Sequence, residues 1–366
     1  MHPVAASGIH RTLTALMGVF DDAEESSRRP FTEPSIMVPN VDSKRFGWTH
    51  YGVMIPDLPE PHRFFSVMSL IGATGSLAFD NDHALADAPR RNASVVVGTA
   101  ASHPAHFGNY AVGRDFVSEP DGSLVRFGDA LTIAGRYPHY RLTGRFGDVE
   151  ADLRLTTSDT VTWFVRNPVY KHLSLLTEYR GRFSTASGAH EVSGLCAFEY
   201  GACPSPYQLR SAPLPAALKA PLDLFVYQII NLGPDDQVLL SHHCIGGRPF
   251  ISTALHRCRN GRGHGQGHGK GHGKGPSLGR VEFRVLEYRQ APEDTPYGIP
   301  MRVPAVTRFT VRDERGIALE VTAELDTGLT YGLGTGFVTG FRHESTWRGE
   351  TISGRGYMEY IDRRDG

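Results

Sequence analysis

A neighbouring acid and phenol, Glu199 and Tyr200, are the residues of this chain best suited to proton chemistry. They end an apolar segment that predicts a β-strand, and successive strand residues face opposite sides of a sheet. Only one of the two side chains can therefore point into a given cavity. A carboxyl group in an apolar pocket has a raised pKa and can act as a general acid near neutral pH. In the structural alternative, Glu199 caps one end of the β-structure or pairs with Arg180 or Arg182.

Histidines and aromatic residues elsewhere in the chain are the next candidates for a binding site. His50 follows Trp48 by two residues, so the two side chains share one face of a strand. His172 and Tyr179 lie shortly before the segment that carries Glu199, and we expect them to line a cavity. The alternative for His50 is a histidine that is satisfied within the core or at its rim.

Other histidines have spacings that bear on metal binding. His103 and His106 have no cysteine or carboxylate nearby to complete a zinc site, so we expect a polar loop. His242 and His243 are adjacent and would face opposite sides of a strand, which disfavours joint ligation with the cysteine that follows. The stretch 257–275 has Gly at alternate positions and predicts a loop with at most adventitious metal binding. We therefore expect no metal and no other cofactor.

Composition excludes several classes of protein. The formal net charge is −1 with a pI near 7.0, which disfavours nucleic acid as a partner. No apolar run reaches the roughly 18 residues of a membrane span.

The four cysteines form no C-x-x-C pair, which favours reduced thiols in the cytoplasm. Residues 1–20 predict a short helix or tail and not a signal peptide. Motifs for phosphate loops, dinucleotide binding, serine hydrolases and zinc proteases are missing from the sequence.

The elements that must position these residues are strands. The 41 glycines and 24 prolines favour many turns and few long helices. Residues 149–156 alternate apolar and polar side chains, and a turn at 157–159 would lead into a returning strand at 160–165. Residues 317–325 alternate in the same way, and a second turn would lead into a strand at 329–332. The two segments predict two similar hairpins.

A repeated motif supports an internal duplication. Residues 193–200 and 353–360 both have the pattern Ser-Gly, then four positions, then Glu-Tyr. The recurrence of this pair as Glu359 and Tyr360 also fits a purely structural role for it. Each copy is expected to be an antiparallel β-unit, either a sandwich or a barrel. The glycine-rich segment 331–337 favours barrels, because barrel corners need bends.

These motifs together resemble a known superfamily. The paired segments that end in Glu-Tyr, the opening segment 46–51 and the glycine-rich segment 331–336 are similar to the tandem lipocalin-like proteins. That superfamily includes carotenoid 1,2-hydratases, AttH-type proteins and fungal lipocalin-like pericyclases, and the resemblance covers residues 45–362 and points to a bacterial branch. It implies an all-β fold of two tandem antiparallel lipocalin-like barrels. The expected division is 1–44 as an N-terminal extension, 45–210 as the first barrel and 211–366 as the second barrel, with the Gly/His-rich loop at 257–275.

The resemblance also implies a chemistry. In the hydratases, an acid at the end of the first barrel is thought to protonate an isoprenoid double bond, and Glu199 takes that position here. Tyr200 stands where those enzymes have a histidine, and their tryptophan does not follow at the usual spacing. We therefore expect a cofactor-independent enzyme that hydrates, isomerises or cyclises a hydrophobic small molecule, an isoprenoid or a polyketide. Trp163, Tyr179 and Tyr331 are expected to shape the substrate.

Two alternatives stay open at this stage. The same pocket could belong to a lipid or pigment carrier without catalysis, in which case the cavity would be entirely apolar. A structural or interaction module would have no cavity. The sequence does not indicate an oligomeric state.

Overall fold

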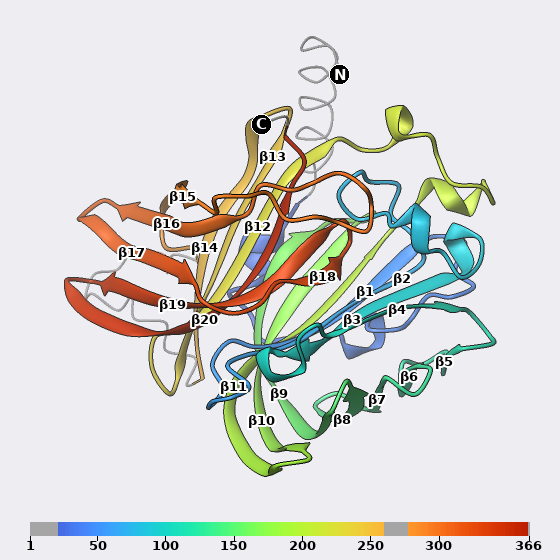
Figure 1. The fold of residues 1–366 in the computed structure, drawn as a ribbon, viewed down its shortest axis with the longest axis horizontal. Helices are drawn as coiled ribbons and strands as arrows, with labels where there is room; N and C mark the ends of the chain where they lie inside the picture. The colour runs from blue at the N-terminus through green and yellow to red at the C-terminus, as the bar shows by residue number, and fades with distance from the viewer. Residues whose placement is uncertain (1–20, 260–276, 365–366) are drawn as a thin grey trace.

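Strands dominate the computed structural model, which describes residues 21–259 and 277–364. Two antiparallel sheets follow one another along the chain, and each curves into a nearly closed barrel (Figure 1). The predicted all-β fold of two tandem barrels is confirmed. The predicted tail at 1–20 and all but the first three residues of the predicted loop 257–275 lie outside the described residues.

The first barrel is an 11-stranded sheet with the order β4-β3-β2-β1-β11-β10-β9-β8-β7-β6-β5. Its edge strands β4 and β5 approach one another through a bridge between Val112 and Phe116. The strands are β1 (Trp48–Ile55), β2 (Phe65–Ile71), β3 (Asn92–Thr99), β4 (His106–Ala111), β5 (Phe116–Ser118), β6 (Leu124–Phe127), β7 (Leu131–Arg136), β8 (His139–Phe146), β9 (Val149–Arg166), β10 (Lys171–Thr185) and β11 (Gly188–Cys203).

The second barrel is a 9-stranded sheet with the order β14-β13-β12-β20-β19-β17-β16-β15, and β18 pairs with β19. Its edges β14 and β15 meet near a bridge between Leu255 and Ser277. The strands are β12 (Leu222–Asn231), β13 (Asp236–Ile245), β14 (Arg248–Cys258), β15 (Arg280–Tyr288), β16 (Pro304–Asp313), β17 (Gly316–Leu325), β18 (Thr330–Leu333), β19 (Gly336–Trp347) and β20 (Glu350–Asp362).

Helical segments in the described part of the chain are short. They are α2 (Ala23–Ser26), η1 (Pro34–Ile36), η2 (Asp82–Ala84), η3 (Pro89–Arg91), η4 (Ala100–Ser102), η5 (Pro206–Gln208) and η6 (Ala216–Leu218). Within residues 21–259 and 277–364, no helix has the length and apolarity that crossing a membrane would require.

The N-terminal extension packs on the first barrel. Phe31 and Met37 are buried in the first barrel's core. The backbone N–H of Phe31 donates to the carbonyl of Asp159, and the Ser27 hydroxyl accepts from the N–H of Trp163. These contacts fix the extension along β9.

The two strands of the repeated motif occupy equivalent places. β11 lies between the first strand of its sheet, β1, and its sequence neighbour β10. β20 lies in the same way between β12 and β19. The predicted duplication is confirmed in this respect.

The predicted pair of hairpins is wrong. β9 runs without interruption from Val149 to Arg166, and a β-bulge takes the place of the turn at 157–159. The N-terminal extension and β10 satisfy the polar groups of this bulge, for example through the Ser158 hydroxyl, which donates to the carbonyl of Leu176. In the second copy β18 pairs with β19 and not with β17. The polar residues at 157–159 indicate a turn in the sequence. In the structure, hydrogen bonds from the N-terminal extension and to β10 stabilise a bulge there instead.

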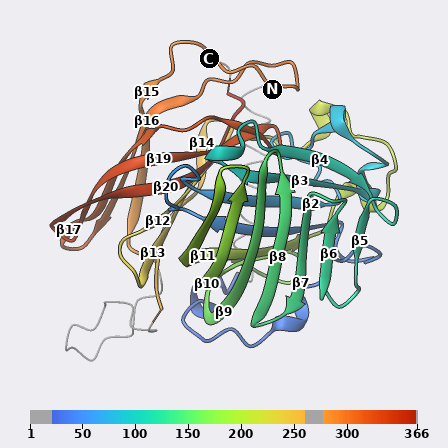
Figure 2. The same cartoon turned by 60° about the horizontal axis from the view of Figure 1, so that its bottom comes forward.

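The strands at the centre of each sheet are buried on both faces. Alternate residues of β1 and β11, such as Val53 and Phe198, belong to the first barrel's core. The residues between them, such as Met54 and Ala197, belong to a second hydrophobic cluster together with residues of β12 and β20. The outer wall of the first barrel therefore packs against the second barrel, and we call this contact layer the junction. Figure 2 shows the two sheets from the side of β8–β11.

The connection between the barrels is anchored by a buried ion pair. The Lys219 ammonium lies 3.0 Å from a carboxylate oxygen of Asp80 and 2.6 Å from one of Asp82. The side chains of Lys219 and Asp80 are 4% and 0% exposed. Asp80 also accepts hydrogen bonds from the Tyr207 hydroxyl and from the N–H of Gly75. Removing one partner would leave the other charge uncompensated, which is far more costly than losing a surface pair.

We expect Lys219→Met to lower the free energy of unfolding by about 3–5 kcal/mol. Urea unfolding followed by circular dichroism measures this loss. The matched control is Arg141→Met, which removes an exposed ion pair with Asp152 and should change the unfolding midpoint little. Equal, small changes in both variants would contradict a supporting role for the Lys219 pair.

Candidate functional site

The candidate site lies in the junction and not inside either barrel. Glu199 is 3% exposed, and its strand neighbours Phe198 and Tyr200 belong to the first barrel's core. Strand alternation therefore turns the Glu199 carboxyl outward, toward the second barrel. The predicted pairing with Arg180 or Arg182 is wrong, because Tyr227 and two histidines surround the carboxyl instead.

Two glycines allow the histidines to approach Glu199. Gly201 lies directly between His50 on β1 and His172 on β10 in the sheet register. Gly52 lies opposite Glu199, and a Cβ atom on Gly52 would stand 2.9 Å from Nε2 of His50. Without side chains at these positions, both imidazoles lean across the sheet toward the carboxylate.

The two imidazoles are held by different partners. Nδ1 of His50 lies 2.9 Å from the carbonyl oxygen of Ser69. Nδ1 of His172 lies 3.1 Å from the hydroxyl of Tyr170. The two rings pack edge to face with their centroids 5.6 Å apart. Each ring therefore directs Nε2 toward Oε2 of Glu199, at 3.7 Å for His50 and 4.0 Å for His172.

The second barrel contributes two phenols and a second buried acid. The Tyr227 hydroxyl on β12 donates to Oε1 of Glu199 at 2.5 Å. Glu359 on β20 is the cross-strand neighbour of Tyr227 and is 4% exposed. The Tyr357 hydroxyl lies 2.9 Å from Oε1 of Glu359 and 2.8 Å from the hydroxyl of Ser66 on β2. The equivalent Glu-Tyr strands of the two barrels thus bring their acids to the same layer.

A buried cation lies next to this group. Arg257 on β14 is 3% exposed, and its guanidinium donates to the side chains of Gln237 and Ser174. Burial lowers the pKa of Arg257, whereas the nearby Tyr227 and Glu199 raise it, and the net shift is downward. Ser174 is the register neighbour of Glu199 on β10, so Arg257 adds positive potential to the side of the site near Glu199.

The two acids have pKa values shifted in opposite directions. Burial raises the pKa of Glu199, but the interactions with His50 and His172 outweigh burial, and the net shift is downward. Burial raises the pKa of Glu359 to about 8, and the negative charge of Glu199 adds to that rise. The acid that keeps its proton near neutral pH is therefore Glu359, and the expectation of a raised pKa at Glu199 is wrong.

Neutral imidazoles complete the site. Burial lowers the pKa of His172 to about 4, with a further decrease from His50. His243, which stacks on Phe225 in the second barrel, has its pKa lowered to about 3, also by burial first.

Several of the residues predicted from the sequence lie elsewhere. Tyr200 points into the first barrel, where its hydroxyl contacts Asn40 and the carbonyl of Val38. Trp163 and Tyr179 are also buried in the first barrel's core. Strand alternation places all three on the face opposite to Glu199, so they cannot contact anything bound in the junction.

Of the remaining predicted residues, Trp48 borders the site and Tyr331 does not. Trp48 packs against Tyr170, which stacks on His172, so Trp48 borders the site as expected from its shared face with His50. Tyr331 lies on β18 and donates from its hydroxyl to Asn81, at a different part of the contact between the barrels.

Sequence reasoning missed most of the second barrel's contribution to the site. Tyr227 lies in no motif, Arg257 begins the segment predicted as a loop, and Tyr357 occupies a variable position of the repeated motif. Glu359 did carry a signal, because it is the repeat of Glu199, but the repetition also fits a structural role and does not by itself indicate a site.

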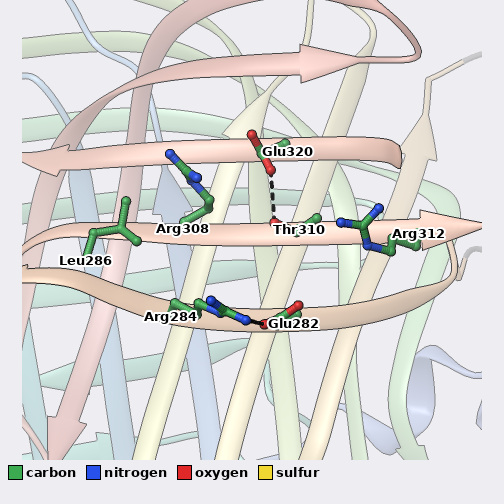
Figure 3. Close-up of a pocket in the computed structure, with 7 residues that line it drawn as sticks. All are labelled: Glu282, Arg284, Leu286, Arg308, Thr310, Arg312 and Glu320. Carbon is green, nitrogen blue, oxygen red and sulfur yellow. Dashed lines mark hydrogen bonds and ion pairs between the residues drawn. The ribbon is translucent and has the colours of Figure 1, made fainter. Parts of the chain in front are cut away.

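A groove on the outer surface of the second barrel is separate from this site. Its lining residues come from β15, β16 and β17 (Figure 3). Glu282 pairs with Arg284, and Thr310 donates to Glu320. These groups satisfy one another, and none of the residues predicted from the sequence lines the groove.

Comparisons with known proteins agree with the observed fold. A family described as "Family of unknown function (DUF6670)" matches residues 68–366. No curated protein matches the chain significantly. A solved structure of a putative AttH from Nitrosomonas europaea is similar with a TM-score of 0.60 and 14% identity, over 92% of this chain and 98% of that chain. CghA bound to Sch210972 is similar with a TM-score of 0.42 and 11% identity, over 87% and 89%. The resemblance to the tandem lipocalin-like superfamily is confirmed at the level of the fold.

The raised pKa of Glu359 predicts a pH-dependent stability. The unfolded chain ionises this group above its ordinary pKa of 4.5, whereas the folded chain holds the proton up to about pH 8. The contribution of Glu359 to stability is therefore complete below pH 4.5 and is lost as the pH rises toward 8, by up to about 1.4 kcal/mol per pH unit.

We expect Glu359→Gln to remove this decline, because the amide resembles the neutral acid. Urea unfolding midpoints between pH 5 and 8.5 measure it, with the exposed Glu344→Gln as the control. An unchanged slope in Glu359→Gln would show that the carboxyl is ionised in the folded protein.

Proposed function

The chain belongs to DUF6670, a family of unknown function, and we propose that it is an enzyme that transfers protons to and from a hydrophobic small molecule at the junction. The observation that carries this proposal is the meeting of two buried acids, Glu199 and Glu359, whose pKa values are shifted in opposite directions. Such a pair separates the roles of proton donor and proton acceptor at one pH.

The proposed donor is Glu359. Its carboxyl is protonated at neutral pH and accepts a hydrogen bond from Tyr357, which fixes its orientation. The proposed acceptor is the Glu199 carboxylate, with the neutral imidazole of His172 beside it. A proton from Glu359 would add to a carbon–carbon double bond, and the acceptor group would take a proton from a neighbouring carbon or from an attacking water. The first route isomerises or cyclises the substrate, and the second hydrates it.

The surroundings of the site support a hydrophobic substrate. Met54, Met68 and Leu70 from the first barrel and Ile229 from the second are buried in the same layer. The rings of Phe164 and Tyr170 flank His172. Aromatic faces stabilise a developing cation, and an apolar layer excludes competing water. An isoprenoid or a polyketide fits these requirements.

The alternative of a lipid or pigment carrier has less support. A lipocalin carrier holds its ligand inside the barrel, but aromatic side chains fill the first barrel here. The ring of Phe65 packs against Phe146 and Phe183, and Tyr140 stacks on Phe198. Binding there would require displacement of the core. A carrier also has no need for two buried acids.

The proposal includes a reducing compartment such as the cytoplasm. Its support is that Cys196, Cys203 and Cys244 form no disulfide within the described residues.

The test is deuterium transfer from solvent. The protein is incubated in D2O with farnesol, geranylgeraniol and a linear polyene ketone, and mass spectrometry detects deuterium bound to carbon. We expect Glu359→Gln to lower the rate by about two or more orders of magnitude. Tyr357→Phe should lower it less, because Tyr357 orients the acid without donating the proton.

The matched control is Tyr200→Phe, which alters an equivalent Glu-Tyr strand on the face away from the junction. Deuterium transfer that persists in Glu359→Gln would refute Glu359 as the donor. Binding of these compounds without any deuterium transfer would favour the carrier.

A further inference from the structure

We propose that His50, His172 and Glu199 bind a divalent transition-metal ion, Zn2+ or Fe2+, with at least one coordination position open to a small molecule. This inference goes beyond the proposed function, which requires only proton transfer, and it rests on the geometry of the three side chains. From the sequence we expected no metal, and no local spacing indicates this site, because the three residues are far apart along the chain.

The distances between the three ligand atoms are slightly longer than those around a bound metal ion. Each of the three residues offers one ligand atom within 4.8 Å of the others, and the contacts between the side chains point to Nε2 of both histidines and Oε2 of Glu199. The carboxylate oxygen is 3.7 Å from His50 and 4.0 Å from His172. Ligands at about 2.0–2.2 Å from a zinc ion lie about 3.0–3.5 Å from each other. Shifts of well under about 1 Å would therefore bring the three atoms into coordination.

The electrostatics of the cluster favour a cation at its centre. The Ser69 carbonyl can only accept a hydrogen bond, so Nδ1 of His50 donates to it and Nε2 is the ring nitrogen that faces Glu199. Nε2 of His172 is buried and has no hydrogen-bond partner among the described residues. The distances to Oε2 are too long for hydrogen bonds. Nε2 of His172 is thus a buried polar atom without a partner among the described residues, a condition that costs free energy. A metal ion between the three side chains would satisfy it.

Outer partners hold each ligand in the required orientation. Ser69 and Tyr170 fix the two imidazoles through Nδ1. Tyr227 fixes the carboxylate through Oε1 and leaves Oε2 for the metal. Histidine ligands of metals commonly have such a partner on the second ring nitrogen. The His172 side chain is 24% exposed, so the site lies near the protein surface on this side.

The donor set indicates the kind of metal centre. Two histidines and one carboxylate are the ligands of catalytic zinc sites and of non-haem iron sites, both of which keep open positions for water or substrate. A Lewis acid in this place would polarise a substrate oxygen or activate a water molecule opposite Glu359.

The experiment measures metal binding without any substrate. Zn2+ is titrated into untagged, metal-free protein by calorimetry, and X-ray absorption spectroscopy identifies the bound ligands. Because His264, His268 and His272 could chelate metals, the titration is repeated with all three replaced by serine. We expect one tight equivalent of Zn2+ in both proteins, with two imidazole nitrogens and oxygen in its coordination shell.

Ligand variants then assign the site. His172→Asn, His50→Asn and Glu199→Gln should each weaken Zn2+ binding by more than about 100-fold, beyond the about 10–100-fold effect of losing an outer partner. His343→Asn is the control, because His343 is a buried histidine with an unpartnered Nε2 that lies outside the cluster. Circular dichroism confirms that each variant folds.

Other results would overturn the inference. The proposal fails if the tight equivalent disappears when the three serines are introduced, or if His172→Asn folds and binds as tightly as the native protein. Spectra of the native protein without imidazole nitrogen around zinc would also refute it, whether or not the variants fold. Deuterium transfer that depends on Glu359 without tight metal binding would leave the proposed function standing and this inference refuted.

Discussion

The burial of both faces of the central strands is the constraint on which the rest of this structure depends. β1, β2 and β11 form a wall whose inner face closes the first barrel's core and whose outer face packs against β12 and β20. Side chains alternate with a period of two, so each residue of these strands belongs to one layer or the other. A polar side chain that faces the junction has little access to bulk water. It must find its partners there, since an unpaired buried charge is costly.

This constraint explains why acids, histidines and an arginine gather at one place. Glu199, Glu359 and Arg257 are all nearly inaccessible to solvent, and each has a phenol or an amide side chain as a hydrogen-bond partner. The same Glu-Tyr motif has different surroundings in the two barrels. Histidines stabilise the carboxylate of Glu199, whereas Glu359 has a phenol and a nearby negative charge. The duplication thus supplied two equivalent carboxyl groups, and the surroundings made them chemically different.

How well the sequence predicted each part of this site depends on whether the relevant pattern is local or involves residues far apart along the chain. His50 and Trp48 were assigned correctly to one face, because that inference needs only the local period of a strand. The turn at 157–159 was wrong, because polar residues in mid-strand indicate a turn as well as a bulge, and only the partners provided by Phe31 and β10 decide between them. Tyr227 and Arg257 were missed because nothing near them in the sequence indicates that they face Glu199. Trp163 and Tyr179 were placed at the site although they lie across the wall from it.

By itself the sequence determined the class of fold, the duplication and the identity of the polar residues that had to be accommodated. Periodicity is a local property of the sequence, and a repeat is found by comparing the sequence with itself. Both can therefore be recognised without knowing how the strands pack. Only the tertiary structure decided which face of β11 meets which face of β20, and hence that Glu199 and not Tyr200 reaches the junction. It also decided that Glu359 is the acid that keeps its proton. The physical reason is that pKa values and ligand geometry depend on neighbours brought together from both barrels, across distances along the chain at which sequence patterns carry no information.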